Sequence, residues 1–125
     1  MRGCVLIVDD SAMMRKIVLR ALTLAGIEFE KTLEAGDGRE ALELLKTNTV
    51  ELIMCDINMP VMNGLEMLEN LRAQNLAVGV PVVMVTTEGS AEHVKQAVAV
   101  GASGYIRKPF TPDQVKLRIT PLLAA

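Results

Sequence analysis

The sequence predicts one α/β domain in which five parallel strands alternate with helices and form a doubly wound sheet. Short β-type segments alternate with helical patterns, which favours parallel strands joined by helical crossovers. Three of the segments are almost wholly apolar, as expected of strands covered on both faces. A chain of 125 residues, half of them hydrophobic, is long enough for one core and too short for a second domain of ordinary size. We therefore expect residues 1–125 to form a single domain.

The predicted strands differ in polarity. The segment 29–35 carries Glu30, Lys31 and Glu34, so it suits the edge of the sheet. The first, third and fourth segments suit its interior. In chain order, the five segments are 4–8 (CVLIV), 29–35 (FEKTLEA), 51–55 (ELIMC), 81–85 (PVVMV) and 104–106 (GYI).

Residues that favour helix ends mark five predicted helices. Ser and Asp accept hydrogen bonds from the free amides of a first turn, Pro suits the first helical position, and Gly ends helices. Because Pro lacks the amide hydrogen, we expect Pro121 to end or kink the last helix. The helices are expected to start at Ser11, at Asp37 or Gly38, after Gly64, at Ser90 and at Thr111-Pro112-Asp113, and the first, third and fourth to end near Gly26, Gln74 and Gly101.

The first predicted helix has a basic side and an apolar side. Arg15, Lys16 and Arg20 form the basic side, which we interpret as solvated. The apolar side, which we expect to face the core, consists of Met14, Ile17, Val18, Ala21, Leu22 and Ala25.

Composition and charge argue against several classes of partner. A net charge of −2 and only three aromatic residues argue against nucleic acid. No apolar segment is long enough for a signal-peptide core or a membrane span, so we expect a cytoplasmic protein with no membrane contact. If Asp9 and Asp56 lie level in the sheet, Cys4 and Cys55 lie about four residues, or about 13 Å, apart along the strands. We therefore expect both cysteines to be reduced.

Polar side chains follow four of the five predicted strands. Because the carboxyl ends of parallel strands meet at one edge of a sheet, where ligands bind, we expect these side chains to lie together. They are Asp9 and Asp10 after the first strand, Asp56 after the third, Thr86 and Thr87 after the fourth, and Lys108, followed by Pro109, after the fifth.

Three carboxylates at close range raise one another's pKa unless a cation neutralises them. Oxygen ligands from two loops favour a hard ion such as Mg²⁺, and a lysine and a hydroxyl suit the oxygens of a phosphoryl group. Each residue alone has a plainer explanation, because an Asp after a strand is often a helix cap and a Lys-Pro pair is often an ordinary loop. The four strand ends together predict an acidic metal site beside a phosphate clamp.

Four segments resemble the receiver domain of bacterial two-component response regulators: VLIVDDS, CDINMPVMNG, VTTEG and YIRKPF. The resemblance covers essentially the whole chain and is strongest to the stand-alone chemotaxis regulators of the CheY type. It implies a flavodoxin-like (βα)5 fold whose five-stranded sheet has the order 2-1-3-4-5. That strand order is known here from the resemblance alone.

The resemblance also implies the roles of the acidic residues. Asp56 would be the phosphoacceptor, receiving a phosphoryl group from the phosphohistidine of a histidine kinase. Mg²⁺ would be held by Asp10, by Asp56 and by the backbone carbonyl of Asn58, with Asp9 contributing through water. Lys108 would pair with the phosphoryl oxygens. These roles need no catalytic histidine, because phosphoryl transfer depends mainly on positioning and charge neutralisation.

The output of such a domain is a change in partner binding. The resemblance implies that Thr86 moves toward the phosphate and that Tyr105 rotates inward behind it. The affected surface is that of the fourth helix, fifth strand and fifth helix, where a downstream target would bind. The resemblance suggests a flagellar motor switch as this target and a phosphatase as a further partner. We expect the protein to be a monomer. Asn58, Thr87 and Glu88 occupy positions that tune dephosphorylation. Thr87 stands where the family commonly has Ala or Gly, so we expect its stiff side chain to slow the loss of phosphate.

Other functions stay open from the sequence. A phosphate sink and a phosphorylation-independent docking receiver would share these motifs. A haloacid-dehalogenase-like phosphatase expects a D-x-D nucleophile after the first strand, and a flavodoxin-like electron carrier expects a hydroxyl-rich phosphate turn there; the DDS segment fits neither. We do not expect an enzyme, apart from catalysis of the protein's own phosphorylation and dephosphorylation.

Overall fold

The computed structural model describes residues 2–87 and 91–123. Strands and helices alternate along these residues, as the sequence predicts. In chain order, the elements are β1 (Arg2–Val8), α1 (Ala12–Leu24), β2 (Phe29–Ala35), α2 (Gly38–Thr47), β3 (Leu52–Asp56), α3 (Gly64–Ala73), β4 (Val82–Thr86), α4 (Ala91–Ala99), β5 (Gly104–Arg107) and α5 (Pro112–Leu123).

The strands form one parallel sheet with the order β2-β1-β3-β4-β5. The predicted fold class and strand order are therefore confirmed, and the polar segment 29–35 lies at an edge. Val8 pairs with Cys55, which brings Asp9 and Asp56 level at the carboxyl ends of β1 and β3. On the other side of β3, Asp56 pairs with Val85. This register brings the polar residues that follow the strands to one edge.

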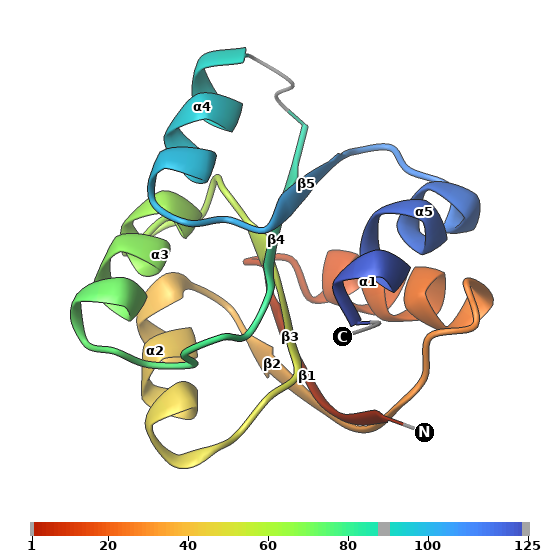
Figure 1. Cartoon of the computed structure of the whole chain (residues 1–125), viewed down its shortest axis with the longest axis horizontal. Helices are drawn as coiled ribbons and strands as arrows, with labels where there is room; N and C mark the ends of the chain where they lie inside the picture. The colour runs from red at the N-terminus through yellow and green to blue at the C-terminus, as the bar shows by residue number, and fades with distance from the viewer. Residues whose placement is uncertain (1, 88–90, 124–125) are drawn as a thin grey trace.

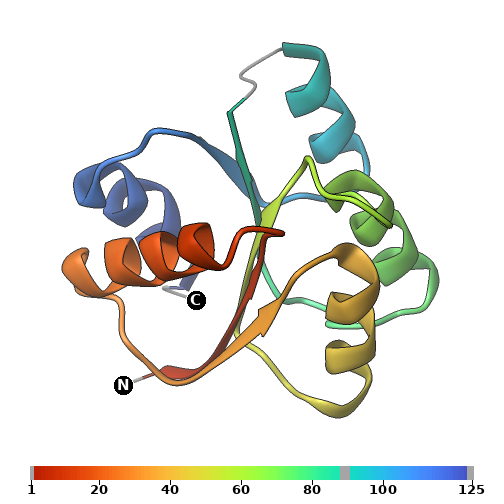
Figure 2. The ribbon, with the colours of Figure 1, turned by 180° about the vertical axis from the view of Figure 1, so that it is seen from behind.

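Helices cover both faces of the sheet. Helices α1 and α5 lie on one face, and α2, α3 and α4 lie on the other (Figures 1 and 2). Side chains of one strand alternate between the two resulting cores: Leu6 and Val8 pack under α2 and α3, whereas Val5 and Ile7 pack under α1 and α5. A strand that is apolar at every position is therefore what this three-layer arrangement requires.

Capping side chains start the first three helices. The hydroxyl of Ser11 accepts a hydrogen bond from the amide of Met14, and the carboxylate of Asp37 accepts one from the amide of Glu40. Asn63, not Gly64, caps α3, since the helix already includes Gly64 as its first residue. The predicted cap at Ser90 lies outside the described residues.

The expectation for Pro121 was wrong in one respect, because α5 continues through this proline to Leu123. A proline in the last turn removes one hydrogen bond, here the one to the carbonyl of Leu117. Leu117 and Pro121 are both exposed, so water can replace that bond.

Cys4 and Cys55 are free and buried, as predicted, and the observed register keeps them four residues apart along the sheet. Burial raises the pKa of the Cys55 thiol far above its usual range, so this residue is an inert part of the core. Within the described part of the chain, no helix has the length and apolar character required to cross a membrane.

Candidate functional site

Three carboxylates meet at the carboxyl edge of the sheet. Asp9 and Asp10 follow β1, Asp56 is the last residue of β3, and one oxygen of each lies within 4.8 Å of the others. Asp9 and Asp56 are buried, with exposed fractions of 3% and 7%, whereas Asp10 is exposed. The cluster is therefore a partly enclosed group of negative charges that opens to solvent at Asp10.

Asp9 is held through all of its polar groups. Its backbone amide donates to the carbonyl of Ala35 on β2, and its Oδ1 accepts from the amide of Ser11 at 2.9 Å. Its Oδ2 accepts from the Nζ of Lys108 at 3.0 Å. Its own carbonyl accepts from the Nη1 of Arg15 at 2.6 Å. This aspartate therefore serves as a fixed point of the cluster.

Asp56 lies in a less balanced environment. Burial raises the pKa of its carboxyl group above the ordinary value, and the negative charges of Asp9 and Asp10 raise the pKa further. The ammonium of Lys108, 3.6 Å from Oδ1, and the backbone amide of Asn58 lower the pKa but do not cancel this rise. Asp56 is therefore an aspartate whose charge is only partly compensated, which favours a cation beside it.

Lys108 is placed by the end of β5. Its backbone amide donates to the carbonyl of Thr86 at 2.7 Å, and the bond to Pro109 is a cis peptide. The ammonium is 0.6 Å nearer to Asp9 than to Asp56, at 3.0 Å against 3.6 Å. Lys108 thus serves both buried carboxylates and binds Asp9 more closely.

The predicted switch residues lie on the neighbouring strands. Thr86 ends β4 with an exposed fraction of 1%, and Thr87 after it is exposed. Tyr105 on β5 is half-buried, and its ring lies 5.8 Å from the guanidinium carbon of Arg118 on α5. Glu88 lies outside the described residues.

Gly64 packs directly against the strand end that carries Asp56. A Cβ atom at this position would collide with the carbonyl oxygen of Asp56 and with the methyl group of Met84. The amide of Gly64 donates to the carbonyl of Ile57 at 2.9 Å. Gly64 was expected to precede the third helix, whereas the structure shows that its lack of a side chain allows close packing against the backbone.

Val61 lies at the tip of the loop between Asp56 and α3. Its φ is +66°, which is rare for a β-branched residue, and it is 76% exposed. The amide of Met62 donates to the carbonyl of Pro60 at 2.7 Å, so the three residues form a tight γ-turn. The loop is therefore strained at a residue that is exposed to solvent.

Arg15 is the residue that the sequence interpretation missed. It was placed on a solvated basic side with Lys16 and Arg20, but its side chain is only 19% exposed. Besides its bond to Asp9, its Nε donates to Oε1 of Glu34 at 2.9 Å. Glu34 comes from β2, so no pattern within the first helix could have revealed this contact.

The residues present fit a hard divalent cation. The donors that meet at the edge are carboxylate oxygens, with no nitrogen or sulfur ligand in the cluster. Mg²⁺ prefers such oxygen ligands and retains several waters, which the exposed position of Asp10 allows. The described cluster can therefore hold Mg²⁺ and leave room for a further oxygen ligand.

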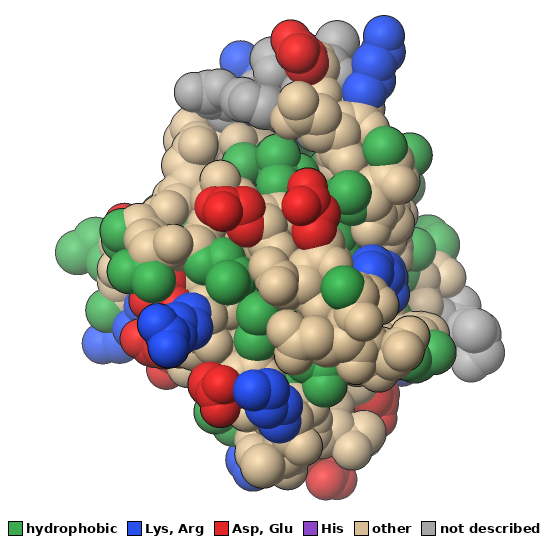
Figure 3. Space-filling model, turned by 90° about the vertical axis from the view of Figure 1, so that its left-hand side faces the viewer, with side chains coloured by type: hydrophobic (Ala, Val, Ile, Leu, Met, Phe, Trp, Pro, Cys, Tyr) green, Lys and Arg blue, Asp and Glu red, His purple; other side chains and the backbone are tan. Residues whose placement is uncertain are grey.

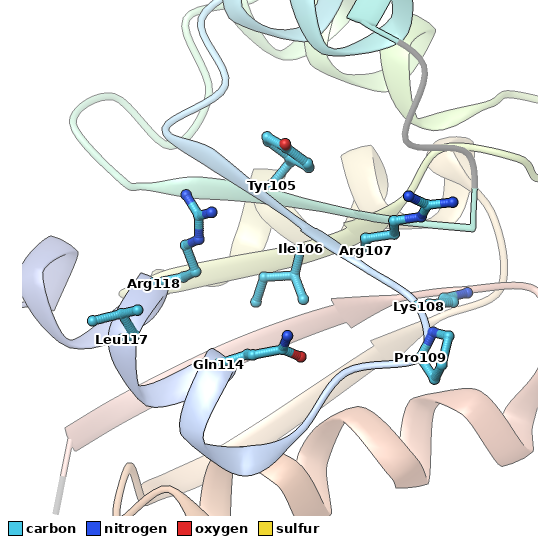
Figure 4. A pocket seen from close by; sticks show the side chains of 8 residues that line it. All are labelled: Tyr105, Ile106, Arg107, Lys108, Pro109, Gln114, Leu117 and Arg118. Atoms are coloured by element: carbon cyan, nitrogen blue, oxygen red, sulfur yellow. The ribbon is translucent and has the colours of Figure 1, made fainter.

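A basic pocket of about 560 Å³ lies between β5 and α5. Arg107, Lys108 and Arg118 contribute cationic side chains to its wall, no acidic side chain lines it, and Arg118 extends from α5 toward Tyr105 (Figure 4). The face over α2, α3 and α4 instead carries acidic and basic side chains in small separate groups (Figure 3). The pocket is therefore a cationic surface that extends from α5 to Lys108.

Comparisons with known proteins agree with this geometry. The model of the response regulator receiver domain family matches residues 5–120. A chemotaxis protein CheY homolog of Campylobacter jejuni is 43% identical over 119 residues, which cover 94% of this chain and 90% of the relative. Chemotaxis protein CheY1 of Helicobacter pylori is 41% identical over 119 residues, 94% of each chain. The solved structure of chemotaxis protein CheY4 of Vibrio cholerae has a TM-score of 0.84 at 39% identity and covers 98% of this chain and 100% of its own.

Proposed function

This chain belongs to the response regulator receiver domain family, and we propose that it is a CheY-type chemotaxis switch that accepts a phosphoryl group on Asp56. The observation that carries the proposal is the meeting of three carboxylates and one lysine at the carboxyl edge of the sheet. A metal site next to a buried, partly compensated aspartate and a lysine ammonium is what phosphoryl transfer needs. We also propose that residues 1–125 form a single receiver domain.

The transfer step follows from the charges around Asp56. A carboxylate oxygen of Asp56 attacks the phosphorus of a phosphohistidine on the kinase, the new O–P bond forms, and the N–P bond breaks with its electron pair passing to the imidazole nitrogen. We propose that Mg²⁺, held by the side chains of Asp10 and Asp56, by the carbonyl of Asn58 and through water by Asp9, would neutralise charge on the phosphoryl oxygens. The rigid end of β3 holds the attacking carboxylate in place during the transfer.

Lys108 supplies the second positive charge. In the unphosphorylated protein its ammonium pairs with Asp9 and lies within 3.6 Å of Asp56, so a small movement brings it to a phosphoryl oxygen on Asp56. The added phosphoryl group presents new acceptor oxygens that also attract the hydroxyl of Thr86. We propose that this movement lets Tyr105 turn inward and changes the surface behind it.

The surface of α4, β5 and α5 is the proposed target face. The basic pocket supplies its positive charge, and Val98 on α4 and Leu117 on α5, which are 61% and 74% exposed, supply apolar anchors. A flagellar motor switch with acidic and apolar groups is the proposed target, a histidine kinase is the proposed donor, and a phosphatase is a further partner. The free thiols of Cys4 and Cys55 suit a reducing compartment, so we propose that the protein acts in the cytoplasm.

Thr87, Asn58 and Glu88 are proposed to set the lifetime of the phosphorylated state. Thr87 is exposed directly beside the buried Thr86, so its branched side chain can hinder a water that approaches the acyl phosphate. We expect Thr87→Ala to lose phosphate about two- to fivefold faster than the native protein, as a smaller side chain removes about 1 kcal/mol or less of hindrance. Equal rates of dephosphorylation would leave Thr87 without this role.

Labelling with acetyl phosphate tests the proposal. The native protein should take up one phosphoryl group only when Mg²⁺ is present, and Asp56→Asn should take up none. Asp113→Asn removes an exposed acidic group at the start of α5 and should label like the native protein. Undiminished labelling of Asp56→Asn would overturn the assignment of the phosphoacceptor. A phosphorylated protein whose affinity for motor-switch peptides is unchanged would indicate a phosphate sink instead.

A further inference from the structure

Arg15 joins three parts of the molecule beside the acidic cluster. It lies in the first turns of α1, which begins next to the carboxyl end of β1 (Figure 2). Its Nη1 donates to the carbonyl of Asp9 at 2.6 Å, and its Nε donates to Glu34 on β2 at 2.9 Å. Two different nitrogens of one planar guanidinium are engaged, so the side chain has little freedom to move.

The bonded carbonyl belongs to the peptide that links Asp9 to Asp10. A peptide unit is planar, so holding its oxygen fixes the direction in which the next residue leaves. Arg15 therefore sets the orientation of the backbone that carries Asp10.

This constraint matters because Asp10 has little else to hold it. The carboxylate of Asp9 accepts bonds from Ser11 and Lys108. The side chain of Asp10 is exposed and makes no hydrogen bond or ion pair with the residues that the structure describes. Its place in the cluster thus depends on its backbone.

We propose that Arg15 is a positioning residue for the divalent cation: anchored by Glu34, it holds the Asp9–Asp10 peptide so that both carboxylates face the same ion. The inference rests on the proposed function only for the assumption that the acidic cluster binds Mg²⁺. Arg15 donates to a backbone carbonyl and to Glu34, so the role proposed for it is positioning and not ligation.

Charge and positioning predict opposite effects, which makes the inference testable. Removing a positive charge near three carboxylates strengthens their attraction for Mg²⁺ if charge is all that Arg15 contributes. Releasing the peptide weakens Mg²⁺ binding, because the ligands must then be ordered when the ion binds. The direction of change in the Mg²⁺ dissociation constant therefore distinguishes a positioning role of Arg15 from an effect of its charge alone.

The test is a titration of each protein with Mg²⁺, followed through the backbone amide NMR signals of the acidic cluster with no phosphodonor present. Arg15→Met should raise the dissociation constant about tenfold, at the lower end of the range found for partners of metal ligands. Arg20→Met removes the same charge from an exposed position on the same helix and should leave the constant unchanged or slightly lower. Arg15→Lys can still donate to the carbonyl of Asp9 and should recover part of the affinity.

A measurement of the unfolding of each variant without Mg²⁺ shows whether Arg15 only stabilises the fold. If Arg15→Met stays folded and binds Mg²⁺ as tightly as the native protein or more tightly, the proposal is overturned. If Arg15→Met does not fold, Arg15→Gln replaces it, since the shorter amide cannot reach the carbonyl, and an unchanged constant is equally decisive. A native protein whose acidic cluster shows no response to Mg²⁺ would overturn both this inference and the metal site of the proposed function.

Discussion

Two connections lead out of the strands that carry the carboxylates, and they are held by different forces. The short β1–α1 corner is held by charge: Lys108 and Arg15 both bind Asp9. The longer β3–α3 loop is held by packing, because Gly64 lies against the carbonyl of Asp56 and a capping box closes the start of α3. A cation or a proton can therefore replace the charges that hold the β1–α1 corner, but neither can replace the packing that holds the β3–α3 loop.

The largest effect is expected at Gly64. Gly64→Ala places a Cβ against the backbone at Asp56, where the strand cannot give way, so we expect a loss of about 3 kcal/mol in the free energy of unfolding. Urea unfolding measures this loss. Since the cause is steric, the loss should be the same with and without Mg²⁺.

Gly104→Ala is the matched control for this prediction. A Cβ at Gly104 meets no atom within 4 Å, so this variant should stay within about 0.5 kcal/mol of the native protein. Equal losses in the two variants would mean that close packing does not hold the β3–α3 loop.

The next effect is expected at Lys108. Lys108→Met leaves Asp9, 3% exposed, without its cationic partner, so we expect a loss of about 2 kcal/mol at pH 7 without Mg²⁺. Saturating Mg²⁺ should restore most of it, because the ion neutralises the same carboxylates. Lys116→Met, at an exposed position on α5, should change stability little under either condition. A loss in Lys108→Met that Mg²⁺ does not reduce would contradict the role of charge in the β1–α1 corner.

These two regions also show what the sequence could predict. Apolar periodicity identified the strands, and because parallel strands end at one edge, the meeting of Asp9, Asp10, Asp56 and Lys108 followed from the strand ends alone. Contacts that depend on the register between two strands were not accessible. The strand order placed β2 beside β1, but the bond between Arg15 and Glu34 also requires the register that pairs Glu34 with Ile7, so the helix pattern could only indicate a basic surface.

Other errors have local causes. Ile17 was expected in the core but is 44% exposed, because the buried stripe of α1 is narrower than its apolar stripe. Pro121 was expected to end or kink α5, and an end at this residue was wrong: the helix continues past it to Leu123, because a proline in the last turn costs only one hydrogen bond. Gly64 marked the start of a helix in the sequence, whereas the collision that requires a glycine involves the backbone of a different element.

A smaller effect is expected from Asp56 itself. Burial and the neighbouring aspartates raise the pKa of Asp56 in the folded state, so its charge destabilises the fold at pH values above that raised pKa. Asp56→Asn should therefore be more stable than the native protein by on the order of 1 kcal/mol at pH 7 without Mg²⁺. The difference should shrink as the pH falls through the raised pKa. The carboxyl group of Asp56 in the native protein then becomes neutral, like the amide that replaces it in the variant.

Thermal unfolding between pH 7 and pH 4, with and without Mg²⁺, measures this difference. Mg²⁺ should stabilise the native protein more than Asp56→Asn, because the variant has lost a charged ligand. Asp113→Asn is the control for the loss of one exposed carboxylate. A stability advantage of Asp56→Asn that grew on acidification would contradict the direction of the pKa shift.

The smallest effect is expected at the tip of the β3–α3 loop. Val61 has a φ of +66° and is 76% exposed, so it bears backbone strain without contributing to a core. Val61→Gly relieves the strain but adds freedom to the unfolded chain, and we expect a net gain of about 0.5 kcal/mol. Val78→Gly, at an equally exposed valine without a positive φ, should instead lose stability by a similar amount. Because the strain is steric, Mg²⁺ should not alter the gain, and losses in both variants would show that the loop is not strained at its tip.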